Sequence, residues 1–324
     1  MRGDWDARAR ENATHYIACG HAQADDAFWA SGAADLENLI LQDVTLDPAA
    51  RALEIGCGIG RLLRPLSERV ERAIGVDISP EMIARAREAL GGRRNVDLMV
   101  TRGTLDGISD AMLDFVASFI VFQHVPSREA VYRYIGEAAR VLKSGGVFRF
   151  QVDGRRRFRV LGTDTWSGVS FDAEALCRRL GPMGFDVLDR WGEGTHYLWI
   201  TAERRNEPGR PESRAIAVRR RSWDEAALRS LLGDLGLDPA EGTAAVVAGS
   251  RSLRSLARPF LRANRRADAE TFLRRAYRVF LGRAADASGL SFYAGQLADG
   301  KRRGYVVDCL LASAEARARF RTLE

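Results

Sequence analysis

A turn of three glycines between an apolar run and a helical pattern constrains the fold of this chain more than any other feature. Residues 53–61 read Leu-Glu-Ile-Gly-Cys-Gly-Ile-Gly-Arg, and a helical pattern follows over residues 61–70. A second apolar run ends in Asp77, about 20 residues beyond the turn. Glycine adopts backbone angles that other residues avoid and lets a ligand approach the backbone. The pattern predicts two strand–turn–helix units of a parallel sheet, whose turns lie at the carboxyl edge where ligands bind.

Strand and helix patterns continue to alternate from this point onward. Strands are predicted near residues 51–55, 73–76, 96–100, 113–119 and 146–152, and helices near residues 61–69, 80–90 and 128–142. Two later extended runs, residues 185–190 and 195–201, predict a closing antiparallel hairpin. The expected fold class is therefore α/β, a doubly wound, mostly parallel sheet with helices on both faces.

The spacing of the glycines separates this turn from the one that binds dinucleotides. The dinucleotide pattern G-x-G-x-x-G would need glycine at position 61, where this chain has Arg61. The pattern here is E-x-G-x-G-x-G, with Glu54 ahead of the turn. A carboxylate beside the turn disfavours a pyrophosphate but suits a sulfonium and an α-amino group, and Asp77 can accept hydrogen bonds from a ribose diol.

The glycine turn and Asp77 resemble the cofactor-binding motifs of the class I S-adenosylmethionine (SAM) dependent methyltransferases. Residues 141–147, Val-Leu-Lys-Ser-Gly-Gly-Val, resemble the "LKPGG" segment of the same class, so the resemblance covers about residues 45–203. It implies SAM as the cofactor, without a metal, with Asp77 on the ribose hydroxyls and the glycine turn beneath the methionine portion. The candidate cofactor-binding residues are Glu54, Gly56, Cys57, Gly58, Gly60, Arg61, Asp77, Ile78, Met82, Thr104 and Phe119. An ordinary glycine-rich βα turn is the alternative interpretation.

One position departs from the pattern of this class. Many members carry an acid after the third strand that binds the adenine amine, whereas this chain has Thr104 there. The Thr104 hydroxyl or backbone groups are therefore expected to take that role, with Asp106 as the second candidate.

The segment after the fourth predicted strand bears on the methyl acceptor. Methyltransferases that act on amide nitrogens or bases carry Asn/Asp-Pro-Pro-aromatic there, and this chain has Phe-Ile-Val-Phe at residues 119–122. Methylation of an exocyclic amine is therefore disfavoured. His124 is the candidate general base, because histidine titrates near neutral pH; a structural role for its ring is the alternative. His196 and His15 are weaker candidates.

Four regions are expected along the chain. Residues 1–45 form an N-terminal helical extension or lid, residues 46–203 the SAM-binding domain, residues 204–222 a polar linker, and residues 223–324 a helical C-terminal domain. The amphipathic block at residues 272–283 and the following turn resemble a small helical module of unknown function that is appended to bacterial cell-surface or glycan-related proteins. These helices are the expected site of contact with a partner or with a second copy.

Composition narrows the class of protein further. The formal charge of +6 comes almost entirely from arginine, with clusters at residues 155–159 and 219–221. Genome composition explains this excess of arginine over lysine as well as selection for phosphate binding does. Nucleic acid is therefore disfavoured as a partner. The four cysteines are too scattered for a disulfide framework or a metal site. No apolar run approaches the length of a membrane span and no secretion signal is visible, so a reduced, cytoplasmic protein is expected.

Three functions are compatible with these features. The favoured one is a SAM-dependent methyltransferase that O-methylates a sugar hydroxyl of a glycan or surface polysaccharide. The second is a methyltransferase for another small metabolite, for RNA or for protein. The third belongs to a different class, a SAM-binding scaffold whose helical tail does the binding.

Overall fold

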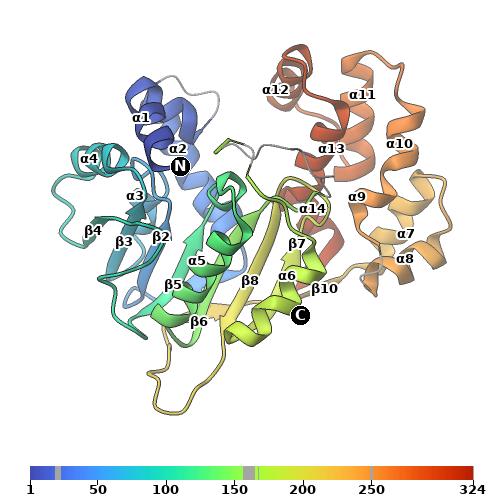
Figure 1. Ribbon diagram of the computed structural model, residues 1–324. Helices are drawn as coiled ribbons and strands as arrows, with labels where there is room; N and C mark the ends of the chain where they lie inside the picture. The colour runs from blue at the N-terminus through green and yellow to red at the C-terminus, as the bar shows by residue number, and fades with distance from the viewer. Residues whose placement is uncertain (19–22, 156–164, 167, 249–250, 324) are drawn as a thin grey trace.

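A seven-stranded sheet forms the centre of the molecule in the computed structural model, which describes residues 1–18, 23–155, 165–166, 168–248 and 251–323 (Figure 1). Across the sheet the strands are β4 (Val96–Val100), β3 (Arg72–Asp77), β2 (Arg51–Ile55), β5 (Leu113–Ser118), β6 (Leu142–Val152), β8 (Leu198–Arg204) and β7 (Phe185–Trp191). The neighbours from β4 to β6 pair in parallel, and β8 is antiparallel to both β6 and β7. The predicted fold class and its closing hairpin are confirmed.

Helices cover both faces of this sheet. On one face a buried cluster joins the strands to α5 (Arg128–Val141) and α6 (Ala173–Leu180). On the other face a second cluster joins them to α3 (Leu63–Leu66) and α4 (Pro80–Ala89). Three short 3-10 or π-helical turns complete this part: η1 (Leu36–Ile40), η2 (Phe122–His124) and η3 (Gly181–Met183). The carboxyl ends of β2, β3 and β5 remain as the edge at which a ligand can bind.

The first predicted helix is shorter than its pattern. Residues 61–69 were expected to be helical, but α3 spans only Leu63–Leu66. The Arg61 side chain is buried and donates a hydrogen bond of 2.7 Å to Asp35, so the residues after the glycine turn are fixed by a tertiary contact before the helix begins.

The N-terminal extension lies against the carboxyl edge of the sheet (Figure 1). It contains α1 (Arg2–Ile17) and α2 (Asp26–Asp35), and α1 is interrupted by the extended backbone of Asn12. Asp6 of α1 accepts a hydrogen bond of 2.5 Å from Ser79 Oγ, at the N-terminus of α4. This bond attaches α1 to the strand end that carries Asp77.

The C-terminal part is a helical bundle with its own core, at the side of the sheet formed by β7 (Figure 1). It comprises α7 (Glu225–Asp234), α8 (Pro239–Val247), α9 (Leu253–Leu256), α10 (Arg258–Ala263), α11 (Ala269–Ala276), η4 (Tyr277–Leu281), α12 (Ala287–Ala298), α13 (Arg303–Ala312) and α14 (Ala314–Phe320). Residues 244–263 include the end of α8 and all of α9 and α10. Pro259 stands in the first turn of α10, where proline begins a helix but cannot continue one.

Short strands and ion pairs attach the bundle to the sheet domain. β1 (Val44–Leu46) pairs with β9 (Ile216–Val218), and β10 (Arg221–Trp223) pairs with β11 (Arg321–Leu323). Residues 204–222, which have the composition of a linker, therefore pair with the chain on both sides. In the part of the chain that the structure describes, no helix is long and apolar enough to cross a membrane.

Candidate cofactor and acceptor site

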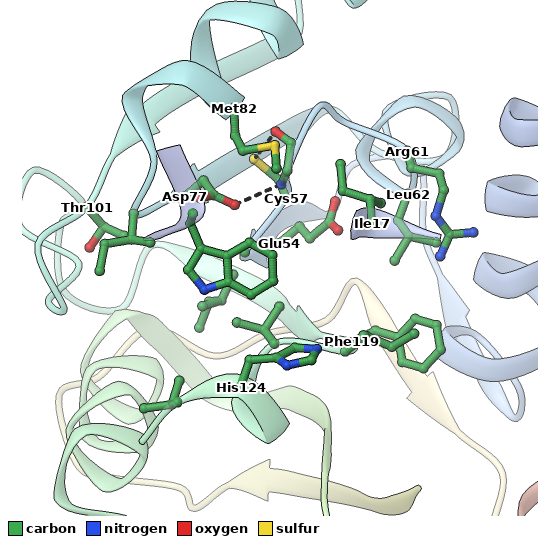
Figure 2. Close-up of a pocket in the computed structure, with 18 of the residues that line it drawn as sticks. Ile17, Glu54, Cys57, Arg61, Leu62, Asp77, Met82, Thr101, Phe119 and His124 are labelled. Atoms are coloured by element: carbon green, nitrogen blue, oxygen red, sulfur yellow. Dashed lines mark hydrogen bonds between the residues drawn. The ribbon is translucent and has the colours of Figure 1, made fainter. Parts of the chain in front are cut away.

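A cavity of about 840 Å³, including the space at its mouth, lies at the carboxyl edge of the sheet. Its walls come from the turns after β2, β3 and β5 and from α1. Figure 2 shows Asp77, Cys57 and Met82 on one side of this space and His124 and Phe119 on the other.

The cavity brings together most of the residues predicted from the sequence. Those that line it are Glu54, Gly56, Cys57, Gly58, Arg61, Asp77, Ile78, Met82, Phe119 and His124. Gly60 and Thr104 are not part of its wall. The side chain of Thr104 donates a hydrogen bond of 2.6 Å to Asp106 instead, and Thr101 lines the cavity at the end of β4.

Two glycines of the turn stand where no side chain fits. Gly56 has a φ of +78°, and a Cβ atom there would lie 2.3 Å from Cγ2 of Val121. Gly58 has a φ of +54°, and its Cβ would lie 2.8 Å from Cδ1 of Ile17. The left-handed backbone and the close neighbours together explain why glycine is required at both positions.

Asp77 joins the two turns that form the floor of the cavity. Its Oδ2 accepts a hydrogen bond of 2.9 Å from the backbone N–H of Gly58 (Figure 2), and its Oδ1 accepts one of 2.9 Å from that of Ser79. Burial raises the pKa of Asp77, and these backbone donors oppose the rise. The carboxylate is thus held in a fixed position, with further lone pairs for the hydroxyl groups of a ligand.

Glu54 gives the clearest indication of the kind of ligand that fits the cavity. Its Oε2 atom is buried and has no hydrogen-bond partner among the described residues. Burial raises the pKa of Glu54 to about 8, against the opposing charge of Arg61. A buried acceptor without a partner is costly, and a cationic ligand group would satisfy it. The α-amino group of SAM is such a group, so the residues present fit this cofactor.

Helix α1 contributes to the wall of the cavity, at positions that the sequence did not specify. Met1, Trp5, Tyr16 and Ile17 line the cavity. The ring of Trp5 meets that of His124 edge-to-face, with centroids 5.4 Å apart. The signal in the sequence was the aromatic residues of the extension, but their spacing does not show which of them face the ligand.

His124 is held by hydrogen bonds at both ring nitrogens. Its Nδ1 lies 2.9 Å from the carbonyl oxygen of Trp166, and its Nε2 lies 3.2 Å from the amide nitrogen of Gln123. Since a carbonyl oxygen can only accept, Nδ1 carries the proton and Nε2 accepts from Gln123. Gln151 fixes that amide by donating a hydrogen bond of 3.0 Å to its oxygen. This geometry favours a structural role for His124, because its basic nitrogen already accepts a hydrogen bond.

The other two candidate histidines, His196 and His15, lie outside the cavity wall. Nδ1 of His196 is 3.5 Å from Oδ2 of Asp153 at the end of β6. Burial raises the pKa of Asp153, but the interactions with His196 and Arg155 outweigh it and hold the pKa well below its usual value. His15 is exposed on α1. Cys19 and three arginines of the predicted cluster, Arg156, Arg157 and Arg159, lie outside the described residues.

The sheet order, the glycine turn and the two acids define the class I methyltransferase fold. A family model described as a methyltransferase domain matches residues 53–150. This part of the chain therefore matches a methyltransferase domain in both sequence and fold. A second model, for a domain of unknown function (DUF4214), matches residues 260–320 and corresponds to the helices from α10 to α14.

Curated relatives match the same central region. The sterol 24-C-methyltransferase erg6 of Schizosaccharomyces pombe is 31% identical over 117 residues, which are 35% of this chain and 30% of that protein. The ubiquinone biosynthesis O-methyltransferase of Idiomarina loihiensis is 31% identical over 102 residues, or 31% of this chain and 41% of that protein. A probable SAM-dependent methyltransferase of Mycolicibacterium smegmatis is 30% identical over 146 residues, or 43% of this chain and 53% of that protein.

The chain therefore spans about a third to a half of the length of these relatives. Among solved structures, phosphoethanolamine N-methyltransferase 1 of Haemonchus contortus superposes with a TM-score of 0.49 at 17% identity, over 66% of this chain and 50% of that one. In the part of the chain that the structure describes, no group of three or more His, Cys, Asp or Glu residues could hold a metal ion.

Proposed function

We propose that the protein transfers the methyl group of SAM to a hydroxyl oxygen of a sugar-containing acceptor. The observation that carries the cofactor assignment is the Oε2 atom of Glu54, which is buried, unpartnered among the described residues and located at the cofactor cavity. SAM would supply an electrophilic methyl group on a good leaving group, so catalysis depends chiefly on placement.

Different residues of this chain would hold different parts of the cofactor. Glu54 would hold the α-amino group, Asp77 the ribose hydroxyls, and Thr101 the adenine side of the cavity. The acceptor oxygen forms the new C–O bond as the S–C bond breaks, and its proton leaves to solvent or to a base. The hydrogen bonds at both nitrogens of His124 support a positioning role for it.

The hydroxyl acceptor is supported by two observations. Residues 119–122 lack the Asn/Asp-Pro-Pro-aromatic segment that binds an amine acceptor. A curated relative named as an O-methyltransferase matches the domain, although others are named for sterol and fatty-acid substrates. The preference for a sugar rests on the C-terminal module, which the sequence associates with glycan-related proteins.

We also propose that residues 1–45 act as a lid. α1 lines the cavity and is attached to α4 through Asp6, so a cofactor must displace it to enter or leave. Opening would break the hydrogen bonds that Asp6 accepts from Ser79 and from the backbone N–H of Glu81, those that Arg8 donates to Thr165, and the contacts of Trp5 and Ile17.

Isothermal titration of SAM tests the cofactor assignment. The wild-type chain should bind SAM, and Asp77→Ala should abolish binding while Asp106→Ala, at an exposed position outside the cavity wall, should not. Absence of SAM binding by the wild type would refute the proposal. A transfer screen over sugar nucleotides, glycans, ubiquinone precursors and RNA then tests the acceptor, and product with RNA alone would exclude the sugar.

A further inference from the structure

A second, larger cavity lies between the methyltransferase domain and the C-terminal helices. It encloses about 1,800 Å³, including its open mouth. Arg155, directly after β6, and Arg190, at the end of β7, belong to one wall. Residues 246–248 and 251–255, together with Asp308 of α13, form the other. Neither domain alone would make this space.

The cavity begins at the same edge of the sheet as the cofactor site. β6 runs parallel to β2 and is separated from it only by β5, so their carboxyl ends are about 10 Å apart. Arg155 follows the end of β6, and the glycine turn at Gly56 follows the end of β2. The part of this cavity formed by the end of β6 therefore lies about two strand spacings from the glycine turn of the cofactor site.

The charged side chains of the cavity are mostly arginine. The six arginines that line it are Arg155, Arg190, Arg251, Arg254, Arg258 and Arg321. Four of these have an acidic partner: Arg155 with Asp153, Arg190 with Glu193, Arg254 with Asp308, and Arg321 with Asp189. Arg251 and Arg258 are exposed and have no acidic partner among the described residues. Two positive charges of the wall thus remain uncompensated.

The other two acids of the wall do not neutralise this pair. Asp172 caps α6 by accepting a hydrogen bond of 3.0 Å from the backbone N–H of Ala175. Glu174 lies 3.5 Å from Arg178 on the same helix. Both carboxylates are engaged on α6, at the opposite wall from Arg251.

The cavity also offers an aromatic surface. Trp223 of β10 lines it, half-buried, with its ring 5.8 Å from that of Trp191. Arg321 lies over the Trp223 ring, 4.7 Å from its centre. A cavity whose lining includes an aromatic ring and two guanidinium groups without an acidic partner suits a ligand with an organic body and a doubly charged anionic group, because arginine binds phosphate with charge-assisted hydrogen bonds.

We propose that this cavity binds a phosphate-bearing organic acceptor, and that the C-terminal helical domain thereby supplies half of the acceptor site. The inference rests on the proposed methyltransferase function and deepens it. Arg251 and Arg258 hold the phosphate, and Trp223 contacts the organic part, whose hydroxyl points toward the cofactor cavity.

The test uses the full chain and three probes: glucose 1-phosphate, inorganic phosphate and glucose. By isothermal titration at low salt, the wild type should bind glucose 1-phosphate more tightly than either of the others. The double variant Arg251→Gln/Arg258→Gln should bind it about tenfold or more weakly. The matched control Arg262→Gln/Arg266→Gln changes two exposed arginines outside the cavity and should bind like the wild type.

The outcomes separate this inference from the proposed function. SAM should bind the double variant as it binds the wild type, since neither arginine lines the cofactor cavity. If SAM binds but glucose 1-phosphate binds no better than inorganic phosphate, or equally in both double variants, the acceptor cavity is refuted and the methyltransferase stands. If SAM does not bind the wild type, the proposed function itself fails.

Discussion

The buried ion-pair network that joins the two halves of the chain should be essential to stability. Asp43 is 4% exposed and accepts hydrogen bonds of 2.6 and 2.7 Å from Arg221 in a bidentate pair. It also accepts one of 2.5 Å from Arg317, which is 2% exposed and reaches on to Asp189. Asp43 has a φ of +65°, a conformation that asparagine tolerates, so Asp43→Asn removes the charge with little change to the backbone.

The expected loss of stability arises because Asp43→Asn leaves two arginines without the negative charge of Asp43. Two arginines would face a neutral amide in a buried site, and breaking such a pair costs about 3–5 kcal/mol. At about 2 °C per kcal/mol for a chain of this size, the melting temperature should fall by about 6–10 °C. Glu315→Gln is the matched control, because its partner Arg283 is 42% exposed and a surface pair contributes at most about 1 kcal/mol.

Thermal and urea unfolding measure the loss, and limited trypsin digestion locates it. Residues 204–222 are rich in arginine and pair with β1 and β11, so detachment of the bundle should expose them to cleavage. If Asp43→Asn is no less stable than Glu315→Gln, the network does not join the two halves as described.

The same network has a predicted pH dependence. Burial raises the pKa of Asp43, but the hydrogen bond from Arg221 and the charge of Arg317 outweigh it, so the pKa lies below its ordinary value. A carboxyl with a lowered pKa stabilises the fold above its unfolded pKa, about 3.9, and loses that contribution as the pH falls further. The wild type and Asp43→Asn should therefore converge in stability at pH values well below 4.

Three further predictions concern the cofactor cavity. Burial raises the pKa of Glu54 to about 8, and a cationic ligand favours its ionised form. The dissociation constant of SAM should therefore fall as the pH rises from 6 to 8. Titrations of Glu54→Gln should lose that pH dependence. Thr101→Val should weaken SAM binding more than Thr104→Val, since only Thr101 lines the cavity; equal effects would contradict the placement. Trp5→Ala should speed SAM dissociation in stopped-flow measurements, because α1 covers the cavity, and an unchanged rate would show that α1 is not a lid.

Local patterns in the sequence were sufficient to predict the strands and the cofactor turn of the sheet domain. Apolar runs place β2, β3 and β4 within one residue of their observed bounds. β2 and β3 are largely buried, and β2 ends before Gly56 while β3 ends at Asp77. The glycine spacing and Glu54 indicated the cofactor, since both are properties of a single short segment. The helix after the turn was too long in prediction, because Arg61 is fixed by Asp35 of α2 and not by its neighbours.

Contacts between distant segments determined which side chains line the two cavities and which partners they have. The sequence by itself determined the fold class, the cofactor turn and the existence of a helical C-terminal part. Only the tertiary structure placed Thr101 in the wall of the cofactor cavity, gave His124 a hydrogen-bond partner at each ring nitrogen, and brought Arg251 and Arg258 into the wall of the second cavity. The reason is physical: strand periodicity and turn spacing are local, whereas a side chain's partner depends on which remote residue the fold brings beside it.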